Sequence, residues 1–263
     1  EVRPYSFRDM VSAYDEQIRG LVDGGADLIL IETCFDALNT KAALYALENI
    51  TGNGNFPAIV SVSVNDKSGR TLTGQTIKAF YTSVSHYPLT AFGLNCSLGA
   101  EDLTPLVEEV AGFAGCPVIC YPNAGLPNEM GGYDETPQQM SSAVRAMAEK
   151  GIVNIVGGCC GTSPEHIAAI SEAVKDIRPR SLTNDTERDG KILTVSGLEA
   201  VSIDLKNGCL NIQAAKGLDK SESDKKGKYI RQERYAGACS RSFYVGDAVE
   251  PEDVSAKFED GIL

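Results

Sequence analysis

The run Asp27-Leu-Ile-Leu-Ile-Glu32 decides the fold class of this chain. Its four consecutive apolar residues between two acidic ones predict a short strand buried on both faces, as in a parallel sheet. A helical pattern comes before it, because apolar residues recur at helical spacing from Phe7 to Val22, after a capping sequence at Ser6-Phe-Arg-Asp9. A second helical segment follows at 37–50. Alternation of strand and helix predicts a parallel sheet with right-handed crossovers.

The same strand–helix unit repeats as far as residue 180. The remaining predicted elements are a strand Ala58–Val64, a helix Thr76–His86, a strand Leu89–Asn95, a helix Leu103–Phe113, a strand Pro117–Tyr121, a helix Pro137–Lys150, a strand Ile152–Val156 and a helix Pro164–Lys175. No dinucleotide-binding GxGxxG follows the first strand. Five units are too few to close a (β/α)8 barrel, and the first helix has no strand before it. We therefore expect an α/β fold, a partial (β/α)8 TIM-type barrel over residues 1–180 that lacks the first three units.

The sequence changes character after Arg180. Residues Asn184–Gly190 are polar and are typical of a linker, and Ile192–Asp204 contains short strand-like pieces. Residues Lys216–Arg234 are dense in mixed charge with few apolar anchors. A segment of this size and polarity buries little core by itself. We expect residues 181–263 to form a polar, poorly structured C-terminal extension.

Composition excludes several classes of function. The chain has 263 residues, 43% of them hydrophobic, and a formal net charge of −12. This acidity argues against binding to nucleic acid or to an anionic membrane surface. No apolar run approaches the ~20 residues needed to span a bilayer, and the N-terminus lacks a signal-peptide pattern. Eight cysteines are too sparse for a disulfide scaffold, and three of them, Cys34, Cys116 and Cys120, lie in apparent core segments. A reducing, cytoplasmic compartment fits best.

Polar residues follow the predicted strands with regularity. They are Glu32, Asn95, Asn123 and three cysteines, Cys96, Cys159 and Cys160. The carboxyl ends of parallel strands meet at one edge of the sheet, where barrel enzymes carry their active sites. Asn95 and Asn123 could bind a substrate or orient the cysteines, and ordinary turn chemistry explains them equally well. Glu32 has the alternative of being a helix-capping or surface carboxylate.

The cysteines predict a metal site. Asn154-Ile-Val-Gly-Gly-Cys-Cys-Gly-Thr162 describes a strand that ends at two adjacent thiols, with glycines that allow the backbone to curl. Adjacent cysteines do not readily form a disulfide with each other, and Cys96 ends another strand in a similar setting. Three thiolates with one open coordination position are typical of catalytic zinc. Such an electron-rich site is poorly suited to activating water but suits the binding of a substrate thiol as thiolate. The alternative for each cysteine is simple packing.

The two histidines offer no nucleophile mechanism. His166 follows Ser163-Pro164-Glu165 at a helix start, where we expect a surface residue of the first turn. His86 lies near a predicted helix end and is expected to be structural. Neither follows a strand, so we predict no catalytic residue beyond the zinc site.

Five motifs carry a family resemblance. They are Leu30-Ile-Glu32-Thr-Cys-Phe-Asp36, Ser68-Gly-Arg-Thr-Leu-Thr-Gly-Gln75, Gly93-Leu-Asn-Cys96-Ser-Leu-Gly, Pro122-Asn-Ala-Gly-Leu-Pro127 and Gly157-Gly-Cys-Cys160-Gly-Thr. Together they resemble the homocysteine-binding barrel of cobalamin-dependent methionine synthases, over roughly residues 1–180. Residues Thr194–Ile203 resemble the linker toward the folate-binding domain of those enzymes, which makes 181–263 a linker and a diverged start of a folate-domain-like extension. The folate motif expected near Gln213–Gly217 is missing, so the resemblance does not extend to folate binding by this chain.

The resemblance implies a function. Cys96, Cys159 and Cys160 would hold zinc, the sulfur of homocysteine would take the fourth position, and Glu32 would bind the substrate amino group. The thiolate would then attack the methyl group of methylcobalamin carried by another module and yield methionine, with the cobalamin-binding and folate-binding modules of the same enzyme as partners. Two alternatives stay open. One is a homocysteine S-methyltransferase that uses betaine or S-methylmethionine, and the other is a truncated, non-catalytic zinc-binding paralogue.

Overall fold

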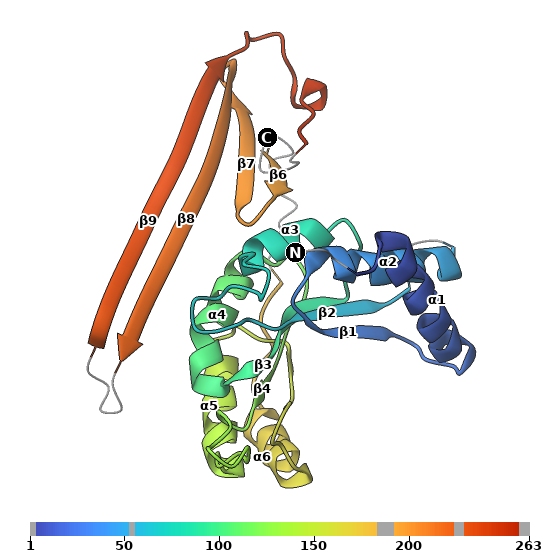
Figure 1. Ribbon diagram of the computed structural model, residues 1–263, viewed down its shortest axis with the longest axis vertical. Coiled ribbons are helices and arrows are strands. Elements are labelled where there is room, and N and C mark those ends of the chain that lie inside the picture. The colour runs from blue at the N-terminus through green and yellow to red at the C-terminus, as the bar shows by residue number, and fades with distance from the viewer. Residues whose placement is uncertain (1–3, 53–55, 183–191, 224–228, 258–263) are drawn as a thin grey trace. The chain divides into compact units, whose positions relative to one another are not determined.

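The computed structural model describes residues 4–52, 56–182, 192–223 and 229–257. They form two compact units, drawn together in Figure 1. The first unit holds Glu1–Thr73 and Val84–Thr183, and the second holds Gly74–Ser83 and Asn184–Leu263. Each unit is described by itself.

The α/β unit is built on a parallel sheet of five strands in the order β1-β2-β3-β4-β5 (Figure 1). The elements in chain order are α1 (Phe7–Asp23), β1 (Ile29–Cys34), α2 (Ala37–Thr51), β2 (Ala58–Val62), α3 (Ile77–Val84), β3 (Ala91–Gly99), α4 (Ala100–Phe113), β4 (Val118–Asn123), α5 (Pro137–Glu149), β5 (Ile155–Val156) and α6 (Pro164–Val174). Helix α2 packs on β1, and α4 packs on β3 and β4. The predicted alternation of five strands with helices is confirmed, and it is consistent with a partial barrel of the TIM type.

Helix starts follow local capping chemistry. Ser6 and Asp9 form the predicted capping box of α1, and Thr136 with Gln139 forms another at α5. Asp36 caps α2 through bonds from the Leu38 and Asn39 amides. None of the helices in the described ranges is long and apolar enough to cross a membrane.

Strand β1 departs from the prediction. Strands β2 and β4 are buried along their whole length, but β1 buries only alternate positions. Leu28 and Leu30 are each 43% exposed, while Ile29 and Ile31 are buried. The reason is that β1 is an edge strand of the described sheet, with helix α2 packed on it. The prediction that both faces of this run are buried was therefore wrong for one face.

The register of the strands places a set of side chains on the face of the sheet that carries the exposed Leu30. Leu30 pairs with Ile59, Ile59 with Ala91, and Asn95 with Tyr121. Registered partners in a parallel sheet point the same way, and so do residues two apart on one strand. This side, called the inner face below, therefore also carries Glu32 and Ser61. At its centre Ile59, Ala91, Ile119 and Tyr121 form a buried cluster, against which Cys159 packs.

Two of the three thiols predicted for the core are buried. Cys34 and Cys120 are buried and Cys116 is half-buried. Burial raises the pKa of Cys34 to about 11 and that of Cys120 to about 12. Such thiols remain protonated and unreactive at neutral pH. All eight cysteines are described, and none forms a disulfide.

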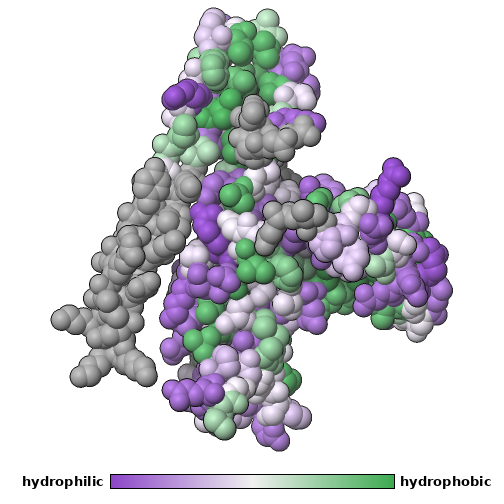
Figure 2. All heavy atoms as spheres, viewed as in Figure 1, coloured by the Kyte–Doolittle hydropathy of each residue, from purple (hydrophilic) through white to green (hydrophobic). Residues whose placement is uncertain are grey.

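The second unit corrects the prediction of a poorly structured extension. It contains a four-stranded antiparallel sheet of β6 (Ile192–Ser196), β7 (Ala200–Lys206), β8 (Cys209–Ser223) and β9 (Tyr229–Tyr244), followed by the short helix η1 (Pro251–Asp253). A tight turn at Asn207-Gly208, with φ of 52° and 68°, joins β7 to β8. On β7, Val201, Ile203 and Leu205 are buried, and hydrophobic side chains gather at the top of the view in Figure 2. The charged run misled the prediction because two long paired strands satisfy each other's backbone without a large core.

Residues Gly74–Ser83 join this second unit through hydrogen bonds. The Gln75 side chain donates to Ser196 Oγ at 3.0 Å and to the Gly197 carbonyl at 2.9 Å. Ser196 Oγ in turn donates to the carbonyl of Ala79 at 2.6 Å. The predicted polar linker Asn184–Gly190 lies outside the described residues.

Candidate metal centre

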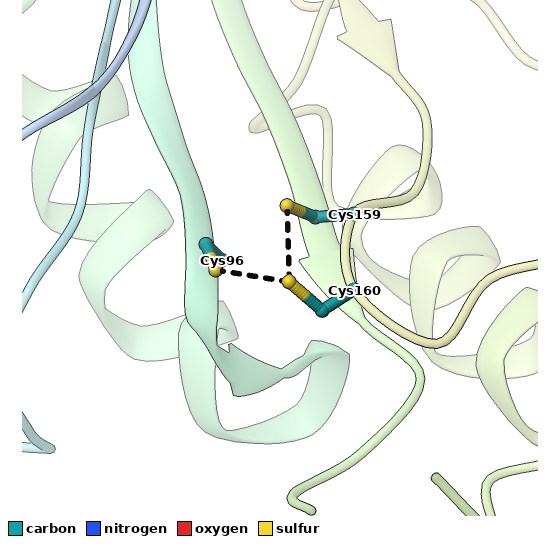
Figure 3. Close-up of side chains that lie close together, drawn as sticks. All are labelled: Cys96, Cys159 and Cys160. Atoms are coloured by element: carbon teal, nitrogen blue, oxygen red, sulfur yellow. Dashed lines mark hydrogen bonds between the residues drawn. The ribbon is translucent and has the colours of Figure 1, made fainter. Parts of the chain in front are cut away.

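The three predicted cysteines come together in the structure. Cys96 lies on β3, and Cys159 and Cys160 lie in the loop after β5 (Figure 3). Cys160 Sγ is 3.5 Å from Cys96 Sγ and 3.9 Å from Cys159 Sγ. All three sulfurs lie within 4.8 Å of one another.

This spacing fits zinc. Sulfurs bound about 2.3 Å from zinc at tetrahedral angles lie about 3.8 Å apart, close to both measured separations. Among the described residues the cluster offers three ligand atoms, all sulfurs, so a tetrahedral ion would keep one position for another ligand. Cys96 and Cys159 are half-buried and Cys160 is exposed, which leaves that position open to approach. The residues present therefore fit an open, three-thiolate zinc site.

Unusual backbone conformations bring the sulfurs into place. Cys96 and Ser97 have φ of 62° and 65°, in the left-handed region that non-glycine residues rarely adopt. The pairing of β3 with β4 shifts register between Asn95 and Gly99, so β3 continues past Cys96 as an irregular strand rather than ending there. Such strained residues tend to cluster at functional sites.

The loop after β5 is held against the end of β4. The Cys159 amide donates to the Pro122 carbonyl at 2.8 Å, and the Cys160 carbonyl accepts from the Ala124 amide at 2.9 Å. Gly161 has a φ of +78°, and a Cβ there would lie 2.3 Å from the Tyr133 ring. The predicted curl at the glycines is thus present at Gly161, where only glycine satisfies both the backbone angle and the tyrosine contact.

The surroundings of the cluster disfavour thiolates unless a cation is bound. Burial raises the pKa of Cys159 to about 11, with a further contribution from negative charge on Cys96 and Cys160. Desolvation and the neighbouring Cys160 also raise the pKa of the Tyr133 hydroxyl. Three thiolates this close together are stable at neutral pH only when positive charge offsets their repulsion.

Asn95 uses its side chain entirely within the protein. It is 1% exposed. Its Oδ1 accepts from the Thr33 amide at 3.1 Å and from Ser61 Oγ at 2.7 Å, while its Nδ2 donates to Thr33 Oγ1 at 2.9 Å and faces Cys159 Sγ at 3.7 Å. The bonds join the left-handed Thr33, with a φ of 55°, to a cysteine of the cluster.

Asn123 has a similar relation to the second cysteine of the pair. It is 3% exposed, and its Oδ1 accepts a hydrogen bond from the Cys160 amide at 3.1 Å. Both asparagines therefore contact the cysteine loop directly. This geometry favours the alternative in which they orient the cysteines.

Glu32 and Tyr121 complete the inner face beside the cluster. Glu32 is exposed at the carboxyl end of β1, next to Thr33, and it does not cap α2, because Asp36 does so. Tyr121 was not predicted as a site residue. Burial raises the pKa of its hydroxyl, with smaller effects from Glu32 and Cys159. The hydroxyl has no hydrogen-bond partner of acceptable geometry among the described residues, although Ser61 and Glu32 lie beside it.

His166 corrects a smaller prediction. It lies in the first turn of α6 as expected, but it is 8% exposed rather than a surface residue. Its Nδ1 accepts from the Ser163 amide at 3.1 Å, so its Nε2 carries the proton and donates to the Glu135 carbonyl at 2.9 Å. The backbone carbonyl of Glu135 shields the ring. The role of His166 is therefore structural. His86 is exposed and lies just after the end of α3.

The fold is that of an α/β protein, consistent with a partial TIM-type barrel, and its three clustered thiols could hold a metal ion. Comparison with known proteins narrows this class. Residues 1–174 match the family model of homocysteine S-methyltransferases. The chain belongs to this family.

One solved structure supports the fold, and two further forms of the same protein are also similar to this chain. The oxidized form of the homocysteine methyltransferase MmuM from Escherichia coli is 23% identical with a TM-score of 0.51, over 62% of this chain and 52% of that one. Its apo form is 24% identical with a TM-score of 0.49, over 64% and 57% of the two chains. Its metallated form is 25% identical with a TM-score of 0.46, over 62% and 51%. The chain spans about half the length of these solved relatives.

The C-terminal sheet has a match of its own. Residues 192–263 match the family model of Hsp20/alpha crystallin proteins. This β domain follows the methyltransferase part of the chain. The predicted diverged start of a folate domain over 181–263 stays a prediction.

Proposed function

We propose that this chain binds zinc through Cys96, Cys159 and Cys160 and activates the thiol of homocysteine for methyl transfer. The observation that carries the proposal is the spacing of the three sulfurs, which suits one tetrahedral zinc ion with a free position. Membership of the homocysteine S-methyltransferase family supports homocysteine as the substrate. The exposed Glu32 on the inner face offers a carboxylate for the substrate amino group.

The residues of the site have different roles in the proposed reaction. Zinc, when bound, supplies the positive charge that keeps the three cysteines and the substrate sulfur deprotonated at neutral pH. Asn95 and Asn123 hold the cysteine loop in position, and Glu32 fixes the substrate by its ammonium group. The substrate sulfur then attacks the methyl carbon in line, so that the S–C bond forms as the bond to the donor breaks. Positioning and thiolate formation supply the rate enhancement.

For the methyl donor we propose methylcobalamin carried by another module, as the barrel motifs suggest, with the product methionine. Because residues 192–263 match the Hsp20/alpha crystallin model, this choice rests on the barrel motifs alone. Betaine or S-methylmethionine is the alternative donor. Incubation of the zinc-loaded chain and homocysteine with each donor, with methionine measured, separates these. Zinc and homocysteine binding without turnover on any donor would favour the non-catalytic zinc-binding alternative.

Thiolate formation can be tested without turnover. Homocysteine binding measured by calorimetry at pH 7, in buffers of different ionisation enthalpy, should release close to one proton per molecule bound. The released proton comes from the substrate thiol. Binding with no proton release would contradict activation of the sulfur.

Replacement Glu32→Gln should weaken homocysteine binding roughly 10- to 100-fold, because it removes the charge that pairs with the substrate ammonium. Zinc content should stay the same, since Glu32 is not a ligand. Calorimetry and metal analysis measure the two quantities. The matched control is Glu108→Gln on α4, whose exposed carboxylate meets Lys150 at 3.4 Å. Equal affinities in wild type and Glu32→Gln would remove Glu32 from the site.

Replacement Asn95→Ala should lower zinc affinity roughly tenfold, as loss of a residue that orients a metal ligand does. It should also lower the free energy of unfolding by about 2 kcal/mol, because the Thr33 amide and Ser61 hydroxyl lose their acceptor. Asn154→Ala is the control. Asn154 accepts from the Val118 amide and donates to the Arg180 carbonyl, both at 2.8 Å. It should cost similar stability and leave zinc affinity intact; a parallel loss in both variants would point to general destabilisation.

A further inference from the structure

The hydroxyl group of Tyr121 is an unexplained polar group in the site. The side chain is 8% exposed, and its oxygen is buried without a hydrogen-bond partner among the described residues. Almost all buried polar groups have a partner, and leaving one without costs about 1–3 kcal/mol. The ring alone would pack equally well as phenylalanine against Ile59, Ala91 and Ile119. Packing therefore explains the ring but not the hydroxyl.

The position of the hydroxyl is specific. Tyr121 pairs in register with Asn95 on the inner face, and its ring cluster contacts Cys159. Ser61 on β2 and Glu32 on β1 lie near the hydroxyl. Ser61 cannot donate to it, because the Ser61 hydroxyl already donates to Asn95 Oδ1 at 2.7 Å. The hydroxyl is thus near both the carboxylate of Glu32 and Cys159 of the sulfur cluster.

This setting selects the chemistry of a ligand group. Both neighbours, the carboxylate and the thiolates, are anionic, so a substrate carboxylate placed between them would be repelled. A primary ammonium group suits the place, because it is cationic and donates several hydrogen bonds. A tyrosine hydroxyl can accept one of these bonds while it donates its own proton to Glu32. In homocysteine, three carbons separate the sulfur from the ammonium nitrogen, so one molecule can offer both groups.

We infer that Tyr121 is a substrate-binding residue that accepts a hydrogen bond from the amino group of the thiol substrate and so selects α-amino thiols over simple thiols. The inference rests on the proposed function and adds a specificity determinant to it. Glu32 supplies the negative charge that attracts the ammonium group, and Tyr121 supplies a hydrogen bond that fixes the orientation of that group. The sulfur end of the substrate is held independently by the metal cluster.

The test compares two thiols on zinc-loaded protein. Homocysteine carries the amino group, and 4-mercaptobutanoate is the same molecule without it. In Tyr121→Phe, homocysteine affinity measured by calorimetry should fall roughly tenfold or more, while 4-mercaptobutanoate affinity stays at the wild-type value. Zinc content and the melting temperature of the ligand-free protein should not fall, because without substrate the hydroxyl has no hydrogen-bond partner among the described residues.

Tyr87→Phe is the matched control. Tyr87 is 4% exposed, and its hydroxyl donates to the Phe56 carbonyl at 2.8 Å. This variant should melt at a lower temperature and keep the wild-type preference between the two thiols. Unchanged discrimination in Tyr121→Phe, or an equal loss for both thiols, would overturn the role of Tyr121 alone. Zinc-loaded wild type that binds neither thiol would overturn the proposed function, and the role of Tyr121 with it.

Discussion

Replacement Cys160→Ser is expected to abolish stoichiometric zinc binding. Cys160 is the middle sulfur of the cluster, at 3.5 Å from Cys96 and 3.9 Å from Cys159. A serine hydroxyl stays protonated at neutral pH and cannot replace a thiolate ligand. Two remaining thiolates leave half of the tetrahedron without protein ligands, so zinc affinity should fall by several orders of magnitude. Metal analysis after dialysis against a competing chelator measures the loss.

The fold should survive this change, because the Cys160 side chain is exposed. Far-ultraviolet circular dichroism and the melting temperature of the metal-free protein check this. Cys239→Ser is the control, since Cys239 is also an exposed thiol, on β9, and does not belong to the cluster. Full zinc content in Cys160→Ser, or its loss in Cys239→Ser, would refute the assignment of the ligands.

Replacement Gly93→Ala is expected to have the largest effect on stability. An added Cβ would lie 1.7 Å from the carbonyl oxygen of Ile119 on the neighbouring strand β4. That oxygen belongs to a buried backbone and cannot move aside without disrupting the pairing of β3 with β4. The free energy of unfolding should fall by about 3 kcal/mol or more, and the variant could fail to fold. Urea denaturation measures the change.

Gly112→Ala is the control for this prediction. Gly112 lies in α4, and a Cβ there meets no heavy atom within 4 Å. Alanine favours a helix over glycine by roughly 0.5–1 kcal/mol, so this variant should be as stable as wild type or more so. A Gly93→Ala protein with wild-type stability would mean that β3 and β4 do not pair as described.

Much of the α/β unit could be predicted from sequence, because strong local signals agree with the fold. Capping at Ser6 and Thr136 marks helix starts, and apolar runs mark the strands that become β2 and β4. The exposure of Leu30 could not be predicted, because a strand's position at a sheet edge depends on pairing between distant segments. The irregular backbone at Cys96 could not be predicted for the same reason.

Some features of the site could also be predicted from sequence, and others could not. The grouping of the cysteines could be predicted, because their residue type is visible in sequence and the predicted strands bring them to one edge of the sheet, although β3 continues past Cys96. Tyr121 could not be predicted as a site residue. It ends an apolar run, which is typical of a core residue, and only the surroundings of its hydroxyl in the structure indicate another role. The antiparallel sheet of β6, β7, β8 and β9 does have a signal in the sequence. Alternation from Val201 to Leu205 followed by Asn207-Gly208 is typical of a hairpin.

X-ray absorption at the zinc edge tests most directly whether the three cysteines hold zinc for a substrate thiol. Protein purified under reducing conditions would be measured with and without homocysteine. We expect one zinc per chain with three sulfur ligands, and four sulfur ligands when homocysteine is added. Absence of stoichiometric zinc, or a sulfur count that homocysteine leaves unchanged, would contradict this expectation.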